Sequence, residues 1–299
     1  MTKTDSGLAR RLQRNGVPVV VMLLAVLVIW YLGAIWMNAA GAIERVLPSD
    51  VPWTWQQLVA ATLDMQRPVL PTPHQVAKDL WSSLVDWPVT SPRNLLFHVA
   101  VTAESTLWGF VMGTLLGLVL AALIVHSRTL DRALLPWIVA SQTVPVLAIA
   151  PIVLVILGSL GFSGTAPKAV IAMYLCFFPV TVAMVQGLRS PQKIETEMMH
   201  TYAASQWQAL WLLRLPASLP FLFPALRVGI AAGLVGAMVA ELPTGAVAGL
   251  GARLLTGSYY GNTVQIWSAL VMSALLGLTL TAAVAGVERL VLSRRGGQA

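Results

Sequence analysis

Long apolar runs recur along the chain and are separated by shorter segments that hold most of its charged residues. A helix that crosses a bilayer needs about 20 mostly apolar residues. Six runs reach this length when the uncharged stretch 133–167 is divided at its glycine-rich segment. The predicted spans are 17–37, 105–125, from near 133 to the glycine-rich segment 158–164, 167–188, 219–242 and 264–287. The pattern therefore predicts an all-α membrane protein with six spans.

The partly polar segment 190–216 separates the fourth and fifth spans and is predicted to form two short helices joined by a turn. Ser190 before Pro191 is typical of an N-cap followed by proline at the first helical position. Ser205, with Gln208 three residues later, matches a capping box and predicts the start of the second helix.

The end of the second short helix is predicted from Pro216. Leu215 precedes Pro216, which disfavours helical geometry at Leu215 and is expected to end the second helix there. Apolar residues at spacings of three and four give each short helix one apolar side. These residues are Met198, Met199, Tyr202, Leu210 and Leu213. We expect the polar sides to face another protein.

Segment 41–100 lies between the first two spans and is rich in proline and tryptophan. Its apolar residues at helical spacing predict two helices that lie at the membrane surface with aromatic anchors. They either brace a platform for a partner or are interfacial helices without one. The predicted order is a cytoplasmic tail at 1–16, a first transmembrane helix at 17–40, this external segment, a core at 101–290 and a cytoplasmic tail at 291–299.

The basic residues predict which side of the membrane each loop faces. Thirteen of them belong to the side that holds both termini and segment 190–216, and six belong to the other side. Cytoplasmic loops carry an excess of Lys and Arg. Both termini and segment 190–216 are therefore predicted to be cytoplasmic.

Composition agrees with an integral membrane protein. Hydrophobic residues make up 57% of the 299 residues and charged residues 10%, and the mean hydropathy is +0.75, whereas soluble domains carry about 25% charged residues. The net charge of +7 comes from basic residues at the ends of apolar runs rather than from one patch, so nucleic acid is not an expected partner. The single cysteine, Cys176, excludes an internal disulfide and is expected to pack as a small apolar residue.

No motif in the sequence predicts enzymatic chemistry. The phosphate-binding pattern G-x4-G-K-[ST] is absent, so we do not expect this chain to hydrolyse ATP by that route. The four histidines do not have metal-ligand spacing, and no serine or cysteine nucleophile motif occurs. We expect no cofactor and no metal in this chain.

Small residues recur every fourth position in two of the predicted spans. Gly109, Gly113 and Gly117 form one row, and Gly229, Gly233 and Ala237 form the other. In lipid this spacing lets helix backbones approach closely. We favour a role for both rows in packing between helices of the same chain over a role in an interface between two copies of the chain.

Several polar residues and prolines in the spans are candidates for a translocation pathway. Pro145 and Pro179 each free a backbone carbonyl, a feature that occurs along pathways and also in simple packing kinks. Gln142 and Thr143 are the uncharged polar candidates to contact a solute. Glu241 is a further candidate, close to the predicted outer boundary, where a boundary carboxylate is favoured over a proton relay.

The spacing in segment 190–216 resembles a known family. Glu197, Ala203, Leu213, Leu215 and Pro216 stand where the EAA loop of ABC importer permeases has its Glu, Gly, aliphatic residue, Leu and Pro. Methionines replace the two alanines of that pattern, and Ala203 replaces its glycine. If that position needs a left-handed backbone, alanine is strained there by roughly 1–2 kcal/mol; if it needs a close approach of two backbones, alanine is the next smallest residue.

The resemblance covers residues from about 70 to 295. It includes Leu70-Pro71-Thr72-Pro73, Gly109-Phe110, Gly187-Leu188-Arg189 and Gly249-Leu250-Gly251. These elements are similar to the nitrate, sulfonate and taurine branch of type I importer permeases, and importers of the hydroxymethylpyrimidine type fit as well. Ser105, where the branch has Arg, and the longer segment 41–69 leave the solute open.

The resemblance implies the type I ABC importer permease fold, with six transmembrane helices and a cytoplasmic coupling helix, in the bacterial inner membrane. It implies a second permease copy, two cytoplasmic ATPase subunits that bind ATP and Mg²⁺, and an external solute-binding protein. The imported solute would be small and polar or anionic, nitrate/sulfonate/taurine-like or pyrimidine/thiamine-precursor-like. The residues expected to dock the ATPase are Glu197, Tyr202, Ala203, Ala204, Ser205, Trp207, Leu215 and Pro216.

A secondary carrier driven by an ion gradient is the alternative. It would use Glu104 or Glu241 for proton coupling. Such carriers often show inverted repeats and charges at the membrane midplane, and neither is visible in this sequence. A membrane scaffold that transports nothing is a third possibility.

Overall fold

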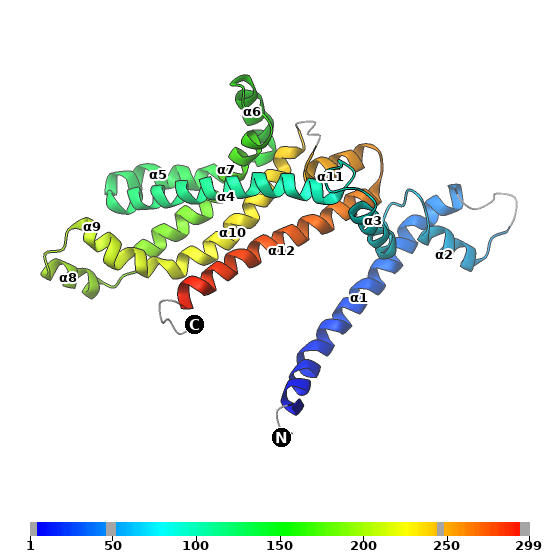
Figure 1. Cartoon of the computed structure of the whole chain (residues 1–299), viewed down its shortest axis with the longest axis horizontal. Coiled ribbons are helices and arrows are strands. Elements are labelled where there is room, and N and C mark those ends of the chain that lie inside the picture. Colours follow the sequence, from blue (N-terminus) through cyan, green and yellow to red (C-terminus); the bar gives the residue numbers. More distant parts are fainter. Residues whose placement is uncertain (1–4, 46–51, 244–247, 294–299) are drawn as a thin grey trace. The chain divides into compact units, whose positions relative to one another are not determined.

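A computed structural model describes residues 5–45, 52–243 and 248–293 of the chain, with side chains from residue 17 onward. All regular secondary structure in these ranges is helical (Figure 1). The predicted cytoplasmic tails lie outside the described residues at positions 1–4 and 294–299. The all-α prediction is confirmed.

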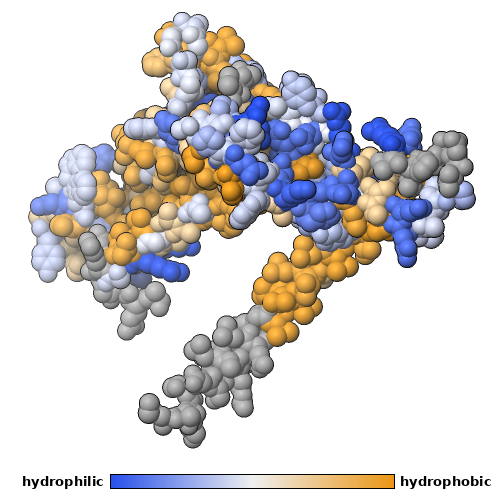
Figure 2. All heavy atoms as spheres, turned by 45° about the vertical axis from the view of Figure 1, so that its right-hand side comes forward, coloured by the Kyte–Doolittle hydropathy of each residue, from blue (hydrophilic) through white to orange (hydrophobic). Residues whose placement is uncertain are grey.

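Five of the described helices are long and apolar enough to cross a membrane, and a bent pair of helices makes a sixth if it counts as one span. The five are Val17–Arg45 within α1 (Asp5–Arg45), α4 (Leu95–His126), α7 (Thr165–Leu188), Gln206–Glu241 and α12 (Thr263–Ser293). In Figure 2 hydrophobic side chains cover much of the visible, described part of α1, and many apolar residues from Val17 to Met37 are exposed, which is typical of a helix in contact with lipid.

The bent pair lies where the third span is predicted. This region forms α5 (Arg128–Ser141) and α6 (Val146–Ser159), which meet at an angle of 102°. The break has a local cause, because Pro145 has no N–H to donate and disfavours helical geometry at Val144. Pro145 becomes the N-cap of α6.

The described residues divide into two compact units, and the first consists of residues up to 87 together with 256–268. It contains α1, α2 (Trp55–Leu63) and α3 (Pro73–Val85), so both helices predicted in segment 41–100 are present. The fully buried Asn38 of α1 holds the Leu70-Pro71 turn: its Nδ2 donates to the carbonyl of Leu70 at 2.9 Å, and its Oδ1 accepts from the N–H of Val69 at 2.7 Å.

The second unit, residues 88–255 and 269–299, is built on three helices. These are α4, α7 and α10 (Leu215–Glu241), which pack side by side (Figure 1). A Cβ added at Gly109 of α4 would lie 2.3 Å from the Cβ of Ala172 on α7, and one at Gly236 of α10 would lie 2.9 Å from the Cα of Ala172. Small residues therefore bring the three backbones together, which confirms packing within the chain as the role of the Gly109 row.

The remaining helices of this unit flank the bundle. Arg227 of α10 and Glu288 of α12 form an ion pair. α11 (Leu250–Tyr259) begins next to the end of α10 in space and belongs partly to each unit. The short helices α8 (Lys193–Thr201) and α9 (Gln206–Ala209) and the π-helix η1 (Leu210–Arg214) connect α7 to α10.

Candidate functional site

The segment between α7 and α10 forms two short helices, as predicted, but the first begins later than expected. α8 starts at Lys193, with Gln192 as its N-cap. The hydroxyl of Ser190 donates to the carbonyl of Gly187 at 2.8 Å and so closes the end of α7. The N–H of Gln192 is bound by the carboxylate of Glu195 at 2.7 Å. The predicted N-cap at Ser190 is therefore wrong, because its hydroxyl is used by the preceding helix.

The turn between α8 and α9 is built around Ala203, which has a φ of 51°. The N–H of Ala203 donates to the carbonyl of His200 at 2.9 Å, and the N–H of Ala204 donates to that of Met199 at 3.0 Å. These two bonds with a left-handed residue between them form a Schellman motif, in which glycine is usual. Ala203 therefore bears a strain of roughly 1–2 kcal/mol.

α9 begins at the predicted residue. The hydroxyl of Ser205 accepts from the N–H of Gln208 at 3.3 Å, and the side-chain oxygen of Gln208 accepts from the N–H of Ser205 at 2.8 Å. This reciprocal pair is the predicted capping box, which is confirmed.

The predicted helix end at Leu215 and Pro216 is wrong. α9, η1 and α10 follow one another without a break, so helical structure continues from Gln206 to Glu241. The N–H of Leu215 donates to the carbonyl of Leu210, five residues earlier. This π-turn precedes Pro216, which occupies the first turn of α10. Proline is tolerated in a first turn, and π-turns of this kind occur inside α-helices at functional sites.

Most residues of the coupling segment, residues 190–216, are exposed on the surface of the protein. No residue of α8 or α9 is buried. Tyr202 is 77% exposed and Trp207 65% exposed, although the ring of Trp207 also lies 6.2 Å from that of His126 at the end of α4. The predicted apolar sides are thus only half covered: Leu210 packs against the core, whereas Met198 is 53% exposed.

The remaining residues predicted to dock an ATPase lie along the same surface. Glu197 is exposed and pairs with Lys193 one turn earlier, at 3.5 Å. Pro216 is exposed, and Leu215 is partly buried against the core of the second unit. The predicted docking residues therefore lie on α8, in the turn after it, on α9 and in the first turn of α10.

The predicted pathway residues are distributed over three elements. Gln142, Thr143 and Pro145 lie at the bend between α5 and α6, and all three are exposed. Pro179 is partly buried inside α7. The neighbouring Ser141 accepts a hydrogen bond from the hydroxyl of Tyr174, which connects the bend to α7.

Glu241, the fifth pathway candidate, is enclosed by its own chain and has no exposed surface. The hydroxyl of Thr102 on α4 donates to it at 3.0 Å, and the N–H of Gly251 donates to its Oε2 at 2.8 Å. The ammonium of Lys168 on α7 lies 3.6 Å from its Oε1 and donates to the carbonyl of Ala248 at 3.1 Å. Glu241 is therefore one partner of a buried ion pair, whose hydrogen bonds offset its desolvation. Its place at the outer boundary of the membrane stays a prediction.

Comparison with known proteins identifies the family. The family model described as binding-protein-dependent transport system inner membrane component matches residues 113–296. This range covers more than half of the chain. The chain belongs to this family of ABC importer permeases. It is a multi-pass membrane protein with the type I importer permease fold.

Individual permeases are similar over most of the chain. The riboflavin transport system permease protein RibX of Chloroflexus aurantiacus is 34% identical over 75% of this chain and 80% of its own length. The formylaminopyrimidine transport permease protein ThiX of Halalkalibacterium halodurans is 30% identical over 79% and 90%. The nitrate import permease protein NrtB of Leptolyngbya laminosa is 25% identical over 85% and 89%. The resemblance found in the sequence is therefore confirmed.

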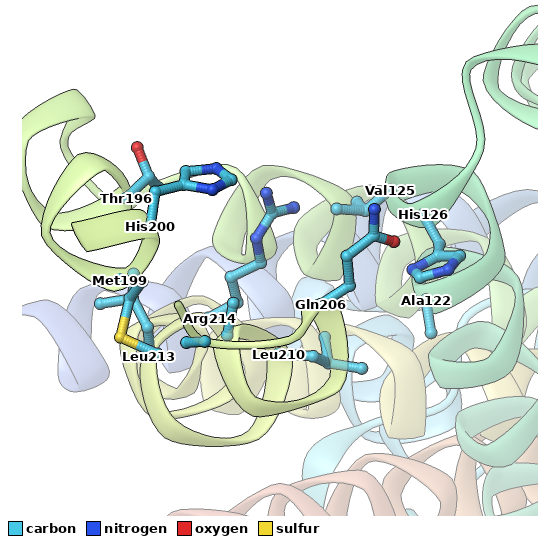
Figure 3. A pocket seen from close by; sticks show the side chains of 12 residues that line it. Ala122, Val125, His126, Thr196, Met199, His200, Gln206, Leu210, Leu213 and Arg214 are labelled. Carbon is cyan, nitrogen blue, oxygen red and sulfur yellow. The ribbon is translucent and has the colours of Figure 1, made fainter. Parts of the chain in front are cut away.

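The permease contains two groups of residues that sequence reasoning missed. One is the set of Lys168, Thr102 and His98 around Glu241 and the 248–251 turn, where His98 accepts from the N–H of Gly249 at 3.0 Å. Lys168 lies one turn inside α7, and a charged residue within an apolar span was the available signal. The second group is the polar part of the lining of a cavity of about 210 Å³ between the coupling segment and the end of α4, formed by His126, His200, Gln206 and Arg214 (Figure 3).

Proposed function

We propose that the coupling segment, residues 190–216, is the surface through which a separate ATPase drives this permease. The observation that supports it best is the exposed turn at Ala203 joined directly to a membrane helix. Strain in a left-handed alanine persists only where surrounding structure imposes it, and such strain clusters at functional sites. The exposed aromatic residues Tyr202 and Trp207 on either side supply the kind of anchor that protein interfaces favour.

The helix that follows the turn could transmit movement of the coupling segment across the membrane. The 36 residues from Gln206 to Glu241 span about 54 Å at 1.5 Å per residue. Trp207 is at one end of this helix and Glu241 is at the other. Movement of the docked segment would therefore act on the 248–251 turn through the hydrogen bond between Glu241 and Gly251.

The assembly we propose has two copies of this permease, two cytoplasmic ATPase subunits and an external solute-binding protein. ATP and Mg²⁺ would be bound by the ATPase subunits, because the sequence has no phosphate-binding loop. The excess of basic residues near segment 190–216 supports its cytoplasmic location, together with both termini. Closure of the two ATPases would move both coupling segments and switch the paired permeases from inward-open to outward-open.

For the solute we propose a small polar heterocycle of the pyrimidine type ahead of nitrate, sulfonate or taurine. The relatives named for riboflavin and formylaminopyrimidine transport are 34% and 30% identical, compared with 25% for the nitrate permease. Gln142 and Thr143, exposed at the α5–α6 bend, are the side chains proposed to contact it. Proline kinks at Pro145 and Pro179 would shape the same route.

Solute uptake into liposomes tests both the energy source and the role of the coupling segment. The permease, its ATPase and its binding protein are placed in liposomes, and solute uptake is measured with ATP or with a proton gradient alone. We expect ATP to be required, and Glu197→Lys and Ala203→Trp to abolish uptake while membrane insertion is unchanged. Arg289→Gln, a charge change at an exposed position of α12, is the matched control. Uptake driven by the proton gradient, or normal uptake in both segment variants, would contradict the proposal.

A further inference from the structure

The cavity between the coupling segment and the end of α4 has a polar wall to which several elements contribute. Its volume is about 210 Å³. His126 comes from the end of α4, His200 from α8, Gln206 from α9 and Arg214 from η1. In Figure 3 the guanidinium of Arg214 extends toward the ring of His200, and Gln206 and His126 lie on its other side. Four groups able to donate hydrogen bonds therefore surround one space.

The side chains of this wall are not used by the rest of the permease. Within the described ranges, Arg214, His200 and the side-chain amide of Gln206 have no hydrogen-bond or ion-pair partner, and Arg214 is only partly exposed. Arginine remains charged at any physiological pH. A partly buried guanidinium without an anion nearby is therefore in an unfavourable state that a ligand would relieve.

The acidic residues closest in sequence do not neutralise this wall. No aspartate or glutamate is among the described residues that line the cavity. On α8, Glu195 accepts from the N–H of Gln192 at 2.7 Å, and Glu197 is paired with Lys193 at 3.5 Å. The cavity thus has a positive charge and several donors, without an acceptor that carries a full negative charge.

We propose that this cavity binds a phosphate group. Arginine matches the geometry of phosphate oxygens and binds them through two parallel hydrogen bonds. Gln206 and the two histidines would donate to the remaining oxygens. Cavities that enclose drug-sized ligands measure about 300–1,000 Å³, so about 210 Å³ suits a single phosphate and a small attached group rather than a whole nucleotide.

The phosphate has two possible sources with the same chemistry. His126 is the last residue of the apolar helix α4, and lipid headgroups are expected near the end of a helix that crosses the membrane. Basic pockets at such positions bind anionic lipids. A soluble phosphate ester could reach the same donors, because His126, His200 and Gln206 are exposed. Binding of either source to the permease alone does not require a docked ATPase, although most of the lining residues belong to the coupling segment.

The test measures binding to the full-length permease in a non-ionic detergent. In one arm, inorganic phosphate is titrated by calorimetry at constant ionic strength, with chloride as the control anion. In the other arm, the melting temperature is compared in mixed micelles that contain phosphatidylglycerol or phosphatidylcholine. Each arm is run with the wild type, Arg214→Gln, His200→Gln and, as a charge-matched control outside the cavity, Arg289→Gln.

We expect saturable binding in at least one arm and its weakening by about tenfold or more in Arg214→Gln, because a hydrogen bond to a charged group contributes about 1.5–3 kcal/mol. His200→Gln should weaken binding less, and Arg289→Gln should not change it. A response to inorganic phosphate identifies a soluble ester, and a response to phosphatidylglycerol alone identifies a lipid. The proposal is overturned if neither ligand binds, or if Arg214→Gln and Arg289→Gln behave alike.

Discussion

The Oε2 of Glu241 accepts a hydrogen bond from the backbone N–H of Gly251 at 2.8 Å. This bond ties the last residue of α10 to the first turn of α11. Thr102 strengthens the connection, because its hydroxyl donates to Glu241 and also accepts from the N–H of Leu250 at 2.8 Å. The far end of the helix that carries the coupling segment is therefore fixed to α4, α7 and the 248–251 turn.

Replacing Glu241 by leucine should destabilise the permease by roughly 3–5 kcal/mol, because Lys168 would remain buried without its counter-charge. Glu241→Gln should cost less, since its amide oxygen can still accept from Gly251 and Thr102. The measurement is the free energy of unfolding in detergent. The double variant Lys168→Met with Glu241→Leu should recover part of the loss. A leucine variant as stable as the wild type would show that the ion pair does not hold this end together.

Gly249→Ala should reduce both stability and uptake. Gly249 has a φ of 127°, and an added Cβ would lie 2.2 Å from the carboxylate carbon of Glu241. Alanine is strained in that backbone region and would also displace the carboxylate. Gly158→Ala is the control, because a Cβ there meets no atom within 4 Å. Melting temperature and uptake are compared, and equal values for the two variants would refute this account of the turn.

The close contact of α4 with α7 makes a further prediction. At Gly109 an added Cβ would lie 2.3 Å from the Cβ of Ala172 and 2.8 Å from the carbonyl oxygen of Ala169. Gly109→Ala should therefore force the helices apart and lower the free energy of unfolding by about 1–3 kcal/mol. Gly286→Ala on α12, where the added atom meets nothing within 4 Å, should be neutral or stabilising. Unchanged stability for Gly109→Ala would mean that the helices do not pack this closely.

The turn in the coupling segment predicts opposite effects for two substitutions at one residue. Ala203→Gly should relieve roughly 1 kcal/mol of backbone strain, whereas Ala203→Val should add to it because a branched side chain resists positive φ. Hydrogen exchange at the Ala204 amide, which is bonded to the Met199 carbonyl, reports the stability of the turn. We expect exchange to be slower in the glycine variant and faster in the valine variant, and the reverse order would contradict the Schellman motif.

Much of this structure could be predicted from local patterns. The long apolar runs predicted the spans, and Ser205 with Gln208 predicted the start of α9, because capping uses neighbours three residues apart. The left-handed turn at Ala203 was one of two alternatives that the glycine position of the resembled family left open. These features depend on residues that are close in sequence.

The features that could not be predicted depend on long-range contacts or on competition between local signals. The pair of Lys168 and Glu241 joins residues far apart in the chain, and hydropathy cannot reveal it. Pro145 and Pro216 each follow an apolar residue, yet the first breaks a span and the second lies within continuous helix. The difference is the π-turn before Pro216, whose backbone pairing has no sequence pattern.

The central claim, that an ATPase docks on the coupling segment from the cytoplasm, is tested most directly by thiol labelling. Cys176 is buried, so Tyr202→Cys supplies an accessible thiol at a position that is 77% exposed. Tyr260→Cys, at a position 75% exposed on the predicted outer side, is the control. We predict that an impermeant maleimide labels position 202 only from the cytoplasmic side, and that the bound ATPase blocks this labelling while position 260 is unaffected. Labelling of position 202 from outside, or at the same rate with and without the ATPase, would contradict the account.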